Sequence, residues 1–266
     1  MAKTKKTKSR LTKKEPEKRL LLPLKKKAGR GSAGRITIRH RGGGVKRLYR
    51  IIDFGQEKMD MPAKVIALEY DPNRTAYIAL LEYKDGEKRY RLAPKDLKVG
   101  DEVICSEETK IQPGNRIKLK NLLVGTQVYN IEIIPGRGGR LVRGAGTAAI
   151  ILAKEGKYCH LEMPSGEIRK IPLDSFASIG QISHPRHRFE KIGKAGIRRL
   201  RGWRPTVRGS AMSPPDHPHG GGGGGKAPIG LKYPKTPWGK HASGVKTRRR
   251  KWTDKYIIQR RKKKKK

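Results

Sequence analysis

The stretch VIALEYDPNRTAYIALLEYKDGEKRYRL, residues 65–92, decides the fold. Apolar runs over 65–70, 76–83 and 88–92 are separated first by Asp71-Pro72-Asn73 and then by Asp85-Gly86. Aspartate followed by proline or glycine favours tight turns, and Asp-Gly between two apolar runs is typical of a β-hairpin. The stretch therefore predicts three short strands, the last two joined as a hairpin.

Two more apolar runs follow, over 103–105 and 117–124, and Pro113-Gly114-Asn115 opens the second of them. Short strands at spacings of roughly 8 to 12 residues, with turn residues between them, indicate a small barrel or sandwich. Five such strands in this length of chain are typical of an OB-type barrel, which often holds nucleic acid on one face.

A second set of strand-like runs begins after Gly125, and helix-forming stretches are nearly absent. The runs cover residues 128–134, 147–153, 158–163, 168–171 and 176–179. Their number and length predict an SH3-like barrel. We therefore expect an all-β fold of four segments: a basic N-terminal extension (1–60), an OB-type barrel (61–125), an SH3-like barrel (126–195) and a basic, Gly/Pro-rich C-terminal extension (196–266), both extensions being long and irregular.

The charge of the chain indicates a polyanionic partner. Its 266 residues include 65 Lys and Arg against 23 Asp and Glu, a formal net charge of +42. Such an imbalance repels itself unless a polyanion neutralises it, which favours nucleic acid. An anionic membrane is the alternative, but the longest apolar run, 148–153, is far shorter than the roughly 20 residues that span a bilayer.

Cations and glycines alternate between Gly29 and Arg50, a composition that suits close contact with a phosphate backbone. The lysine-rich segments 1–27 and 246–266 are expected to be disordered in isolation. We predict RNA contacts from the following residues: Arg35, Arg39, His40, Arg41, Lys46, Arg47, Arg50, Arg74, Arg137, Arg140, Arg143, His184, Arg186, His187, Arg188, Lys194, Arg198, Arg199, Arg201, Trp203, Arg204, Arg208, Lys226, Lys246, Arg248, Arg249 and Arg250.

Three tryptophans lie in the basic segments, at positions 203, 238 and 252. Their rings could stack on nucleotide bases, or they could dock back onto the protein's own barrels. The residue pattern leaves both interpretations open.

The stretch 204–226 contains candidate motifs for phosphate binding, metal binding and catalysis. It contains too much proline and glycine for a regular helix or strand, so we expect an outside surface to give it shape. Its glycines before Lys226 nearly spell a phosphate-binding loop, but Ala227 stands where a metal-binding Ser or Thr is required and Pro228 disfavours the helix that should follow. The dinucleotide fingerprint at Gly29, Gly31 and Gly34 fails in the same way, because neither a strand nor a helix flanks it.

Asp216, His217 and His219 could serve as a metal site or as a carboxylate-oriented base. Neighbouring residues of a proline-rich loop seldom face one another, and no nucleophile is placed near them. We therefore expect no catalytic residue, no metal and no cofactor. A loop-based, metal-dependent transferase or hydrolase using Asp216 and His217 is the alternative function, and a free RNA chaperone without a fixed partner is another.

The two cysteines, Cys105 and Cys159, lie singly in strand-like runs without a Cys-x-x-Cys partner. This pattern favours small buried residues in a reducing compartment over a zinc ribbon or a disulfide.

A family resemblance rests on several motifs in a fixed order. They are Gly34-Arg35-Ile36-Thr37-Ile38-Arg39-His40-Arg41-Gly42-Gly43-Gly44, Tyr70-Asp71-Pro72-Asn73-Arg74, Pro164-Ser165-Gly166-Glu167, Arg204-Pro205-Thr206-Val207-Arg208-Gly209, Ala211-Met212 and Asp216-His217-Pro218-His219-Gly220-Gly221-Gly222. Together, from about Leu20 to Arg261, they resemble protein two of the large ribosomal subunit in its bacterial form. One departure is Gly223, which stands where members of the family usually carry a glutamate.

The resemblance implies two barrels bound to large-subunit rRNA, with tails that reach into the particle. It also implies roles in translation, in assembly and in association with the small subunit, and contacts with neighbouring ribosomal proteins. The loop that contains Asp216, His217 and His219 would lie near the peptidyl-transferase centre, with His217 as a supporting residue because the chemistry is credited to RNA. The implied location is the ribosome, cytoplasmic or organellar, with neither membrane contact nor homo-oligomer.

Overall fold

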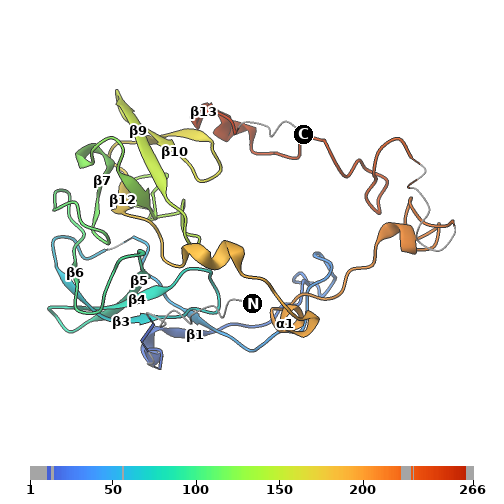
Figure 1. Ribbon diagram of the computed structural model, residues 1–266, viewed down its shortest axis with the longest axis horizontal. Helices are drawn as coiled ribbons and strands as arrows, with labels where there is room; N and C mark the ends of the chain where they lie inside the picture. The colour runs from blue at the N-terminus through green and yellow to red at the C-terminus, as the bar shows by residue number, and fades with distance from the viewer. Residues whose placement is uncertain (1–10, 13–14, 56, 223–228, 230, 262–266) are drawn as a thin grey trace, which may run out of the picture. The chain divides into compact units, whose positions relative to one another are not determined.

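The computed structural model describes residues 11–12, 15–55, 57–222, 229 and 231–261 (Figure 1). The chain divides into two compact units. The first unit comprises Met1–Leu24, Arg47–Lys191 and Thr253–Lys266, and the second comprises Lys25–Lys46 and Ile192–Trp252. Both units are therefore assembled from segments that lie far apart in the sequence.

The stretch 65–92 supplies most of three neighbouring strands of a four-stranded antiparallel sheet in the first unit. The strands are β3 (Ala63–Glu69), β4 (Ile78–Tyr83), β5 (Lys88–Leu92) and β6 (Glu102–Val103), in the order β5-β4-β3-β6. The Asp71 carboxylate accepts a hydrogen bond from the Asn73 N–H at 2.8 Å, and the Asp85 carboxylate accepts one from the Glu87 N–H at 3.1 Å. These turns reverse the chain at the places that the sequence predicts.

A second, seven-stranded antiparallel sheet lies in the same unit. Its order is β13-β11-β10-β9-β8-β12-β7. The strands are β7 (Arg116–Lys118), β8 (Gln127–Tyr129), β9 (Ala149–Glu155), β10 (Tyr158–Glu162), β11 (Ile168–Pro172), β12 (Phe176–Ile179) and β13 (Ile257–Gln259). The prediction of an all-β fold, an OB-type barrel followed by an SH3-like barrel, is confirmed.

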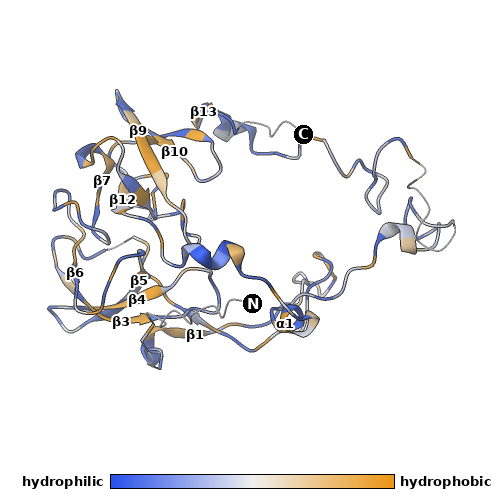
Figure 2. Cartoon of the chain, in the orientation of Figure 1, coloured by the Kyte–Doolittle hydropathy of each residue, from blue (hydrophilic) through white to orange (hydrophobic). Residues whose placement is uncertain are grey.

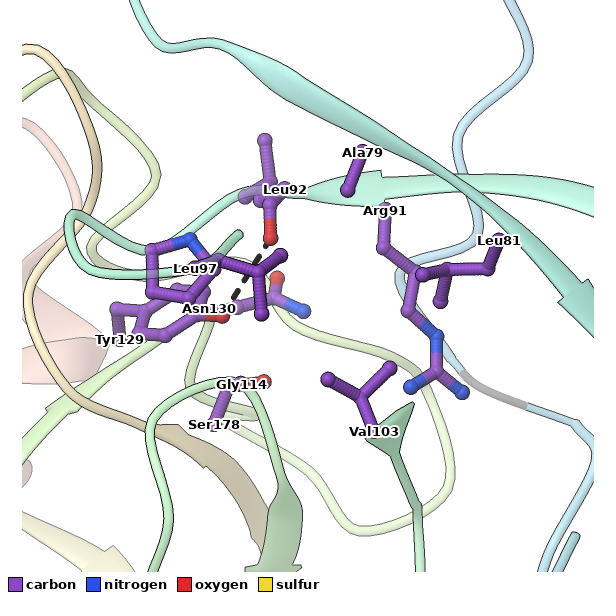
Figure 3. Close-up of a pocket in the computed structure, with 11 residues that line it drawn as sticks. Ala79, Leu81, Arg91, Leu92, Leu97, Val103, Gly114, Tyr129, Asn130 and Ser178 are labelled. Carbon is purple, nitrogen blue, oxygen red and sulfur yellow. Dashed lines mark hydrogen bonds between the residues drawn. The ribbon is translucent and has the colours of Figure 1, made fainter. Parts of the chain in front are cut away.

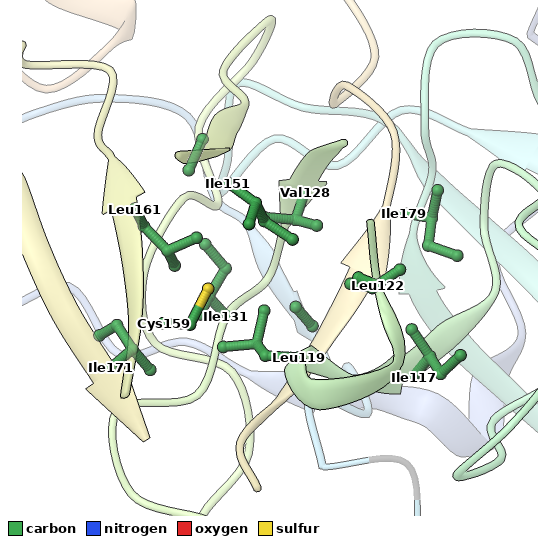
Figure 4. Close-up of a cluster of buried hydrophobic side chains, with 12 residues drawn as sticks. Ile117, Leu119, Leu122, Val128, Ile131, Ile151, Cys159, Leu161, Ile171 and Ile179 are labelled. Carbon is green, nitrogen blue, oxygen red and sulfur yellow. The ribbon is translucent and has the colours of Figure 1, made fainter. Parts of the chain in front are cut away.

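The two sheets bury separate apolar clusters. Figure 4 shows the cluster of the larger sheet, where Leu119, Ile131, Ile151 and Leu161 are fully buried. The smaller sheet buries a second set, which includes Val65 and Leu81. In Figure 2 the apolar residues gather on the strands of the two sheets. Burial of this apolar surface supplies the main driving force for folding of the first unit.

The four segment ranges expected from sequence remain a prediction, but strand pairing crosses them, first at β7 and again at β13. β7 lies inside the range 61–125 assigned to the first barrel, yet it pairs with β12 of the larger sheet. The run 117–124 is also not one strand, because the 3₁₀ turn η2 (Leu119–Asn121) follows β7. Strands far along the chain decide which sheet β7 joins and where β7 ends. The local sequence pattern carries no information about those strands.

The basic ends hold more structure than the sequence indicates. In the N-terminal extension, η1 (Lys18–Leu20) leads into β1 (Leu21–Pro23), which pairs with β2 (Leu48–Arg50). In the C-terminal extension, η6 (Lys251–Tyr256) precedes β13, which pairs with β11. β13 adds its few apolar residues to the edge of the larger sheet, whereas β1 and β2 form a two-stranded sheet of their own. Disorder of the rest of these ends in isolation stays a prediction.

The other helical elements of the described residues are short. They are η3 (Pro185–Phe189), α1 (Ala195–Leu200) and η4 (Gly209–Ala211). Among the described residues no helix has the length and apolar character needed to cross a membrane.

A fully buried ion pair joins β7 to the loop after β8. The Arg116 guanidinium donates to the Glu132 carboxylate at 2.8 Å, and the side chains are 0% and 1% exposed. Arg116 also donates to the Asn130 carbonyl at 2.7 Å, and Glu132 accepts from the Gly136 N–H at 3.1 Å. Burial lowers the pKa of the Arg116 guanidinium, and the Glu132 carboxylate opposes that shift. The hydrogen bonds on both sides compensate for removal of the two charges from water.

Both cysteines are buried and free, as the sequence predicts. Burial raises the pKa of Cys105 and of Cys159 to about 11. Since only the thiolate is nucleophilic, very little of either thiol is reactive at pH 8. We expect both to resist iodoacetamide in the native chain and to react fully in denaturant, measured by mass spectrometry. Rapid native labelling at pH 8 would contradict the burial, and free glutathione is the control for reagent activity.

Candidate nucleic-acid interface

The second unit carries most of the residues that we predict to contact RNA, and it exposes them. Of that set, His40 and Arg199 are partly buried, and fourteen others are exposed. They are Arg35, Arg39, Arg41, Lys46, Lys194, Arg198, Arg201, Trp203, Arg204, Arg208, Lys246, Arg248, Arg249 and Arg250. Lys226 lies outside the described residues. Exposed cations in this density can each reach a phosphate oxygen.

The glycine-cation segment is held against the chain that follows α1. The Gly42 N–H donates to the Gly202 carbonyl at 3.1 Å, and the Arg204 N–H donates to the His40 carbonyl at 3.0 Å. A Cβ on Gly44 would lie 3.1 Å from the Gly202 Cα, so the two backbones meet where only glycine fits. The segment thus has a defined backbone of its own.

Two of the tryptophans lie beside arginines of this segment. The Arg41 guanidinium carbon is 3.5 Å from the centroid of the Trp203 ring, and that of Arg39 is 5.3 Å from the Trp238 ring. Both are within the range of a cation–π attraction. Neither of our two interpretations, stacking on bases or docking on the barrels, included this arrangement. Trp252 is 71% exposed.

The predicted RNA-contact residues of the first unit differ in how far they are engaged within the protein. Arg137, Arg140, Arg186 and Arg188 are exposed. Arg74 pairs with the buried Asp71 carboxylate at 2.5 Å. The remaining members are Arg47, Arg50, Arg143, His184 and His187, and each makes a contact within the protein: Arg47 donates to the Pro72 carbonyl, Arg50 to the Leu48 carbonyl and Arg143 to the Gly139 carbonyl, while both histidines face Glu190.

Arg143 is an example of an arginine that contacts the protein itself. Its guanidinium carbon lies 4.5 Å from the centroid of the Phe54 ring, and burial lowers its pKa. Arg143 is nevertheless exposed, so it supports the shape of the basic loop around it and can also meet a phosphate.

The loop 204–222 has a hydrogen-bonded framework within the chain. The Met212 N–H donates to the Gly209 carbonyl, and the Met212 carbonyl accepts from the Gly221 N–H at 3.1 Å. The Gly220 N–H donates to the His217 carbonyl at 2.7 Å. The expectation that only an outside surface gives this stretch shape is therefore wrong for 204–222, because turn bonds between its own backbone groups replace helix and strand bonds.

His217 is the centre of this framework. It is 7% exposed, and its Nδ1 accepts a hydrogen bond from the His219 N–H at 3.0 Å. A nitrogen that accepts carries no proton, so the ring hydrogen of the neutral form is on Nε2. A Cβ added to Gly209 would lie 2.5 Å from the His217 Cε1, which shows how closely that glycine backbone covers the ring.

His219 continues the framework to the next segment. Its Nε2 accepts a hydrogen bond from the Lys235 N–H at 2.8 Å, and its ring centroid is 4.7 Å from that of His217. Asp216 is exposed, and its backbone N–H donates to the Ser213 carbonyl at 3.1 Å. The sequence singles out the two histidines but assigns no structural role to Gly209 or Ser213, whose backbones position the loop. A single glycine or serine in a proline-rich loop is too common to signal such a role.

Neither of two hollows in the first unit includes Asp216 or His217. Figure 3 shows a cavity of about 10 Å³, room for about one water, lined by residues that include Arg91, Leu92 and Tyr129. A larger depression of about 320 Å³ lies beside Leu68 and Leu97. The first is too small to enclose an organic substrate, and the second is lined by Leu68, Leu97 and Val99 together with Asp96 and Lys98.

The rejected nucleotide motifs have a structural explanation where they are described. Gly29 and Gly31 lie in a pair of backbone turns closed by the antiparallel bridge between Arg30 and Ile36. The Gly31 N–H donates to the Arg35 carbonyl at 2.9 Å, so it is not available to a pyrophosphate. The near phosphate-binding loop falls largely outside the described residues.

Two family models match the chain. Residues 17–105 match the model described as Ribosomal Proteins L2, RNA binding N-terminal domain, and residues 112–239 match Ribosomal Proteins L2, C-terminal domain. The first match covers the four-stranded sheet and the glycine-cation segment, and the second covers β7 to β12 and the loop with His217. A structural, RNA-binding protein of the large subunit accounts for the exposed cations and for a histidine engaged in packing. The chain belongs to the ribosomal protein L2 family.

Proposed function

We propose that the two sheets anchor the chain on large-subunit rRNA, and that the exposed cations of the second unit bind further phosphates during assembly. In this proposal the loop 204–222 lies near the peptidyl-transferase centre, and the chain supports association with the small subunit and contacts neighbouring ribosomal proteins. The RNA contacts are those predicted from the sequence. The observation that carries the proposal is a hydrogen-bonded loop that exposes Arg204 and Arg208 and is centred on the buried His217.

His217 acts as a framework residue in this proposal. A general base must present a free lone pair to the reacting group. The Nδ1 lone pair is used by the His219 N–H, and the ring is covered by Gly209. Asp216, the partner that the alternative enzyme would need, is exposed, and the residues around it form no three-ligand metal group within the described part of the chain. The geometry therefore favours support of an RNA centre over protein chemistry.

We expect His217→Ala to loosen the loop and His217→Asn to preserve it, because the asparagine amide oxygen can accept the hydrogen bond that Nδ1 accepts. Losing a buried hydrogen-bond acceptor costs about 1–3 kcal/mol, which corresponds to roughly 5- to 150-fold more frequent opening. The measurement is trypsin cleavage after the exposed Arg208 in the purified chain. Cleavage should rise in His217→Ala and stay close to wild type in His217→Asn.

The same variants test the chemistry in reconstituted large subunits. A framework role predicts that His217→Asn supports peptide-bond formation nearly as well as wild type. A general base would make the asparagine and alanine variants equally poor, by about 10²- to 10⁴-fold. Gly209→Ala serves as a third variant, since it keeps the imidazole but displaces it, and Gly193→Ala is its matched control because nothing lies within 4 Å of the added Cβ.

A further inference from the structure

Three potential metal ligands converge around the short 3₁₀ helix η3 of the first unit. His184 precedes it, His187 lies within it and Glu190 follows it, and one ligand atom of each lies within 4.8 Å of the other two. Within the described residues this is the group of three His, Cys, Asp or Glu side chains that could hold a metal ion. The sequence assigned both histidines to RNA contact and expected no metal, and Glu190 was not singled out.

The ring of His184 is fixed from outside the group. It stacks on Tyr77, with centroids 4.7 Å apart and an interplanar angle of 12°. Its Nδ1 lies 3.3 Å from the Thr75 carbonyl oxygen, so Nδ1 carries a hydrogen and donates it. A ring nitrogen that donates to a backbone carbonyl is the usual support of a metal-binding histidine, because it directs the other nitrogen at the metal.

That other nitrogen faces a carboxylate. His184 Nε2 lies 2.9 Å from Glu190 Oε1, and His187 Nδ1 lies 3.0 Å from Glu190 Oε2. Both ring nitrogens of His184 thus face oxygens that only accept hydrogen bonds. The position between His184 and Glu190 therefore calls for a positive centre, which a second ring proton or a metal ion can supply.

We propose that His184, His187 and Glu190 bind one divalent transition-metal ion of the zinc class. Two imidazoles and one carboxylate suit zinc or cobalt, whereas magnesium and calcium prefer oxygen ligands throughout. Bond lengths near 2.0–2.2 Å in a tetrahedral site separate neighbouring ligand atoms by about 3.3–3.6 Å. The two histidine–glutamate distances would lengthen by a few tenths of an ångström, and the widest separation in the group, at most 4.8 Å, would shorten as the side chains close on the ion. The fourth position stays open to water.

Cobalt(II) titration of the purified, full-length, metal-free chain, stripped of nucleic acid in high salt, tests this site. We expect one tightly bound ion per chain with the visible d–d absorption of a tetrahedral complex, and displacement of that signal by zinc. Glu190→Gln, His187→Gln and His184→Gln should each weaken binding by at least about tenfold, since even losses in the outer shell have effects of that size.

His160→Gln is the matched control, because His160 also faces a glutamate, Glu155, at 3.5 Å but without a second histidine. It should bind cobalt as the wild type does. Glu190→Gln leaves the stack of His184 on Tyr77 in place, so its loss of binding cannot come from misfolding of that ring. A wild-type chain that binds no cobalt would overturn the proposal. So would binding that survives in all three ligand variants, or binding that is lost instead in His217→Gln.

Discussion

The affinity of the chain for large-subunit rRNA will fall by about 10³- to 10⁵-fold between 50 mM and 200 mM salt. Each phosphate that a lysine or arginine neutralises releases condensed counterions, and roughly 6 to 10 such contacts produce this loss. The exposed cations of the second unit, with a formal charge of +42 on the whole chain, can supply that number. The measurement is filter binding or fluorescence anisotropy with an rRNA fragment over a series of salt concentrations.

A triple variant tests whether the predicted residues supply the contacts. Arg35, Arg198 and Arg208 are exposed members of the predicted set, and replacing all three with glutamine should reduce the log–log slope by about 2 to 3. The matched control replaces three exposed lysines outside that set, Lys64, Lys84 and Lys157. Equal effects of the two triple variants would show that the predicted residues have no special role. An affinity independent of salt would contradict RNA binding through phosphates altogether.

Replacing Glu132 with glutamine will destabilise the first unit by about 3–5 kcal/mol. The substitution leaves the guanidinium of Arg116, 0% exposed, without a compensating charge. Breaking a buried ion pair on one side costs this much because the remaining charge has lost both water and partner. Urea unfolding followed by circular dichroism of the full chain measures the difference in free energy of unfolding.

Two further variants separate the charge effect from a general effect of substitution. Glu87→Gln removes a carboxylate that is 45% exposed and pairs with Lys58 and Arg89, and the expected change is below about 1 kcal/mol. The double variant Arg116→Met with Glu132→Leu should recover most of the lost stability, because an apolar pair replaces the ion pair without leaving a buried charge. If the double variant were as unstable as Glu132→Gln, packing rather than charge would be the cause.

Local pattern predicted the sheets well because their strands have strong turn signals between them. Lys88–Leu92 and Phe176–Ile179 begin and end in the structure at the residues expected. The pairing of β7 with β12 and of β13 with β11 could not be predicted in the same way. Those pairings depend on which edge strand is unoccupied when the chain returns, and that information is not local.

For the loop 204–222, the sequence correctly predicted the absence of regular elements but not the hydrogen bonds within the loop. Proline and glycine correctly excluded regular elements there, but their presence does not mean that the segment lacks internal bonds. The contact of Gly209 with the His217 ring and the bond from the Gly220 N–H to the His217 carbonyl depend on turns several residues long. The sequence located His217, but the hydrogen bond that its Nδ1 accepts could not be predicted from the residue pattern.

The pairing of β13 with β11 attaches the C-terminal part of the chain to the first unit. The chain leaves the first unit at Ile192 and belongs to it again from Thr253, so the long excursion between these residues is tethered at both ends. The residues farthest from both tethers along the contour are those near its middle, about thirty residues from either end, where His219 to Gly222 lie. An extended strand of that length spans on the order of 100 Å, which sets an upper limit on how far the tip can reach. A chain cut before β13 would lose its second attachment to the first unit. Its free C-terminal segment would then have a far larger accessible volume, and residues 219–222 would reach a single binding position less often.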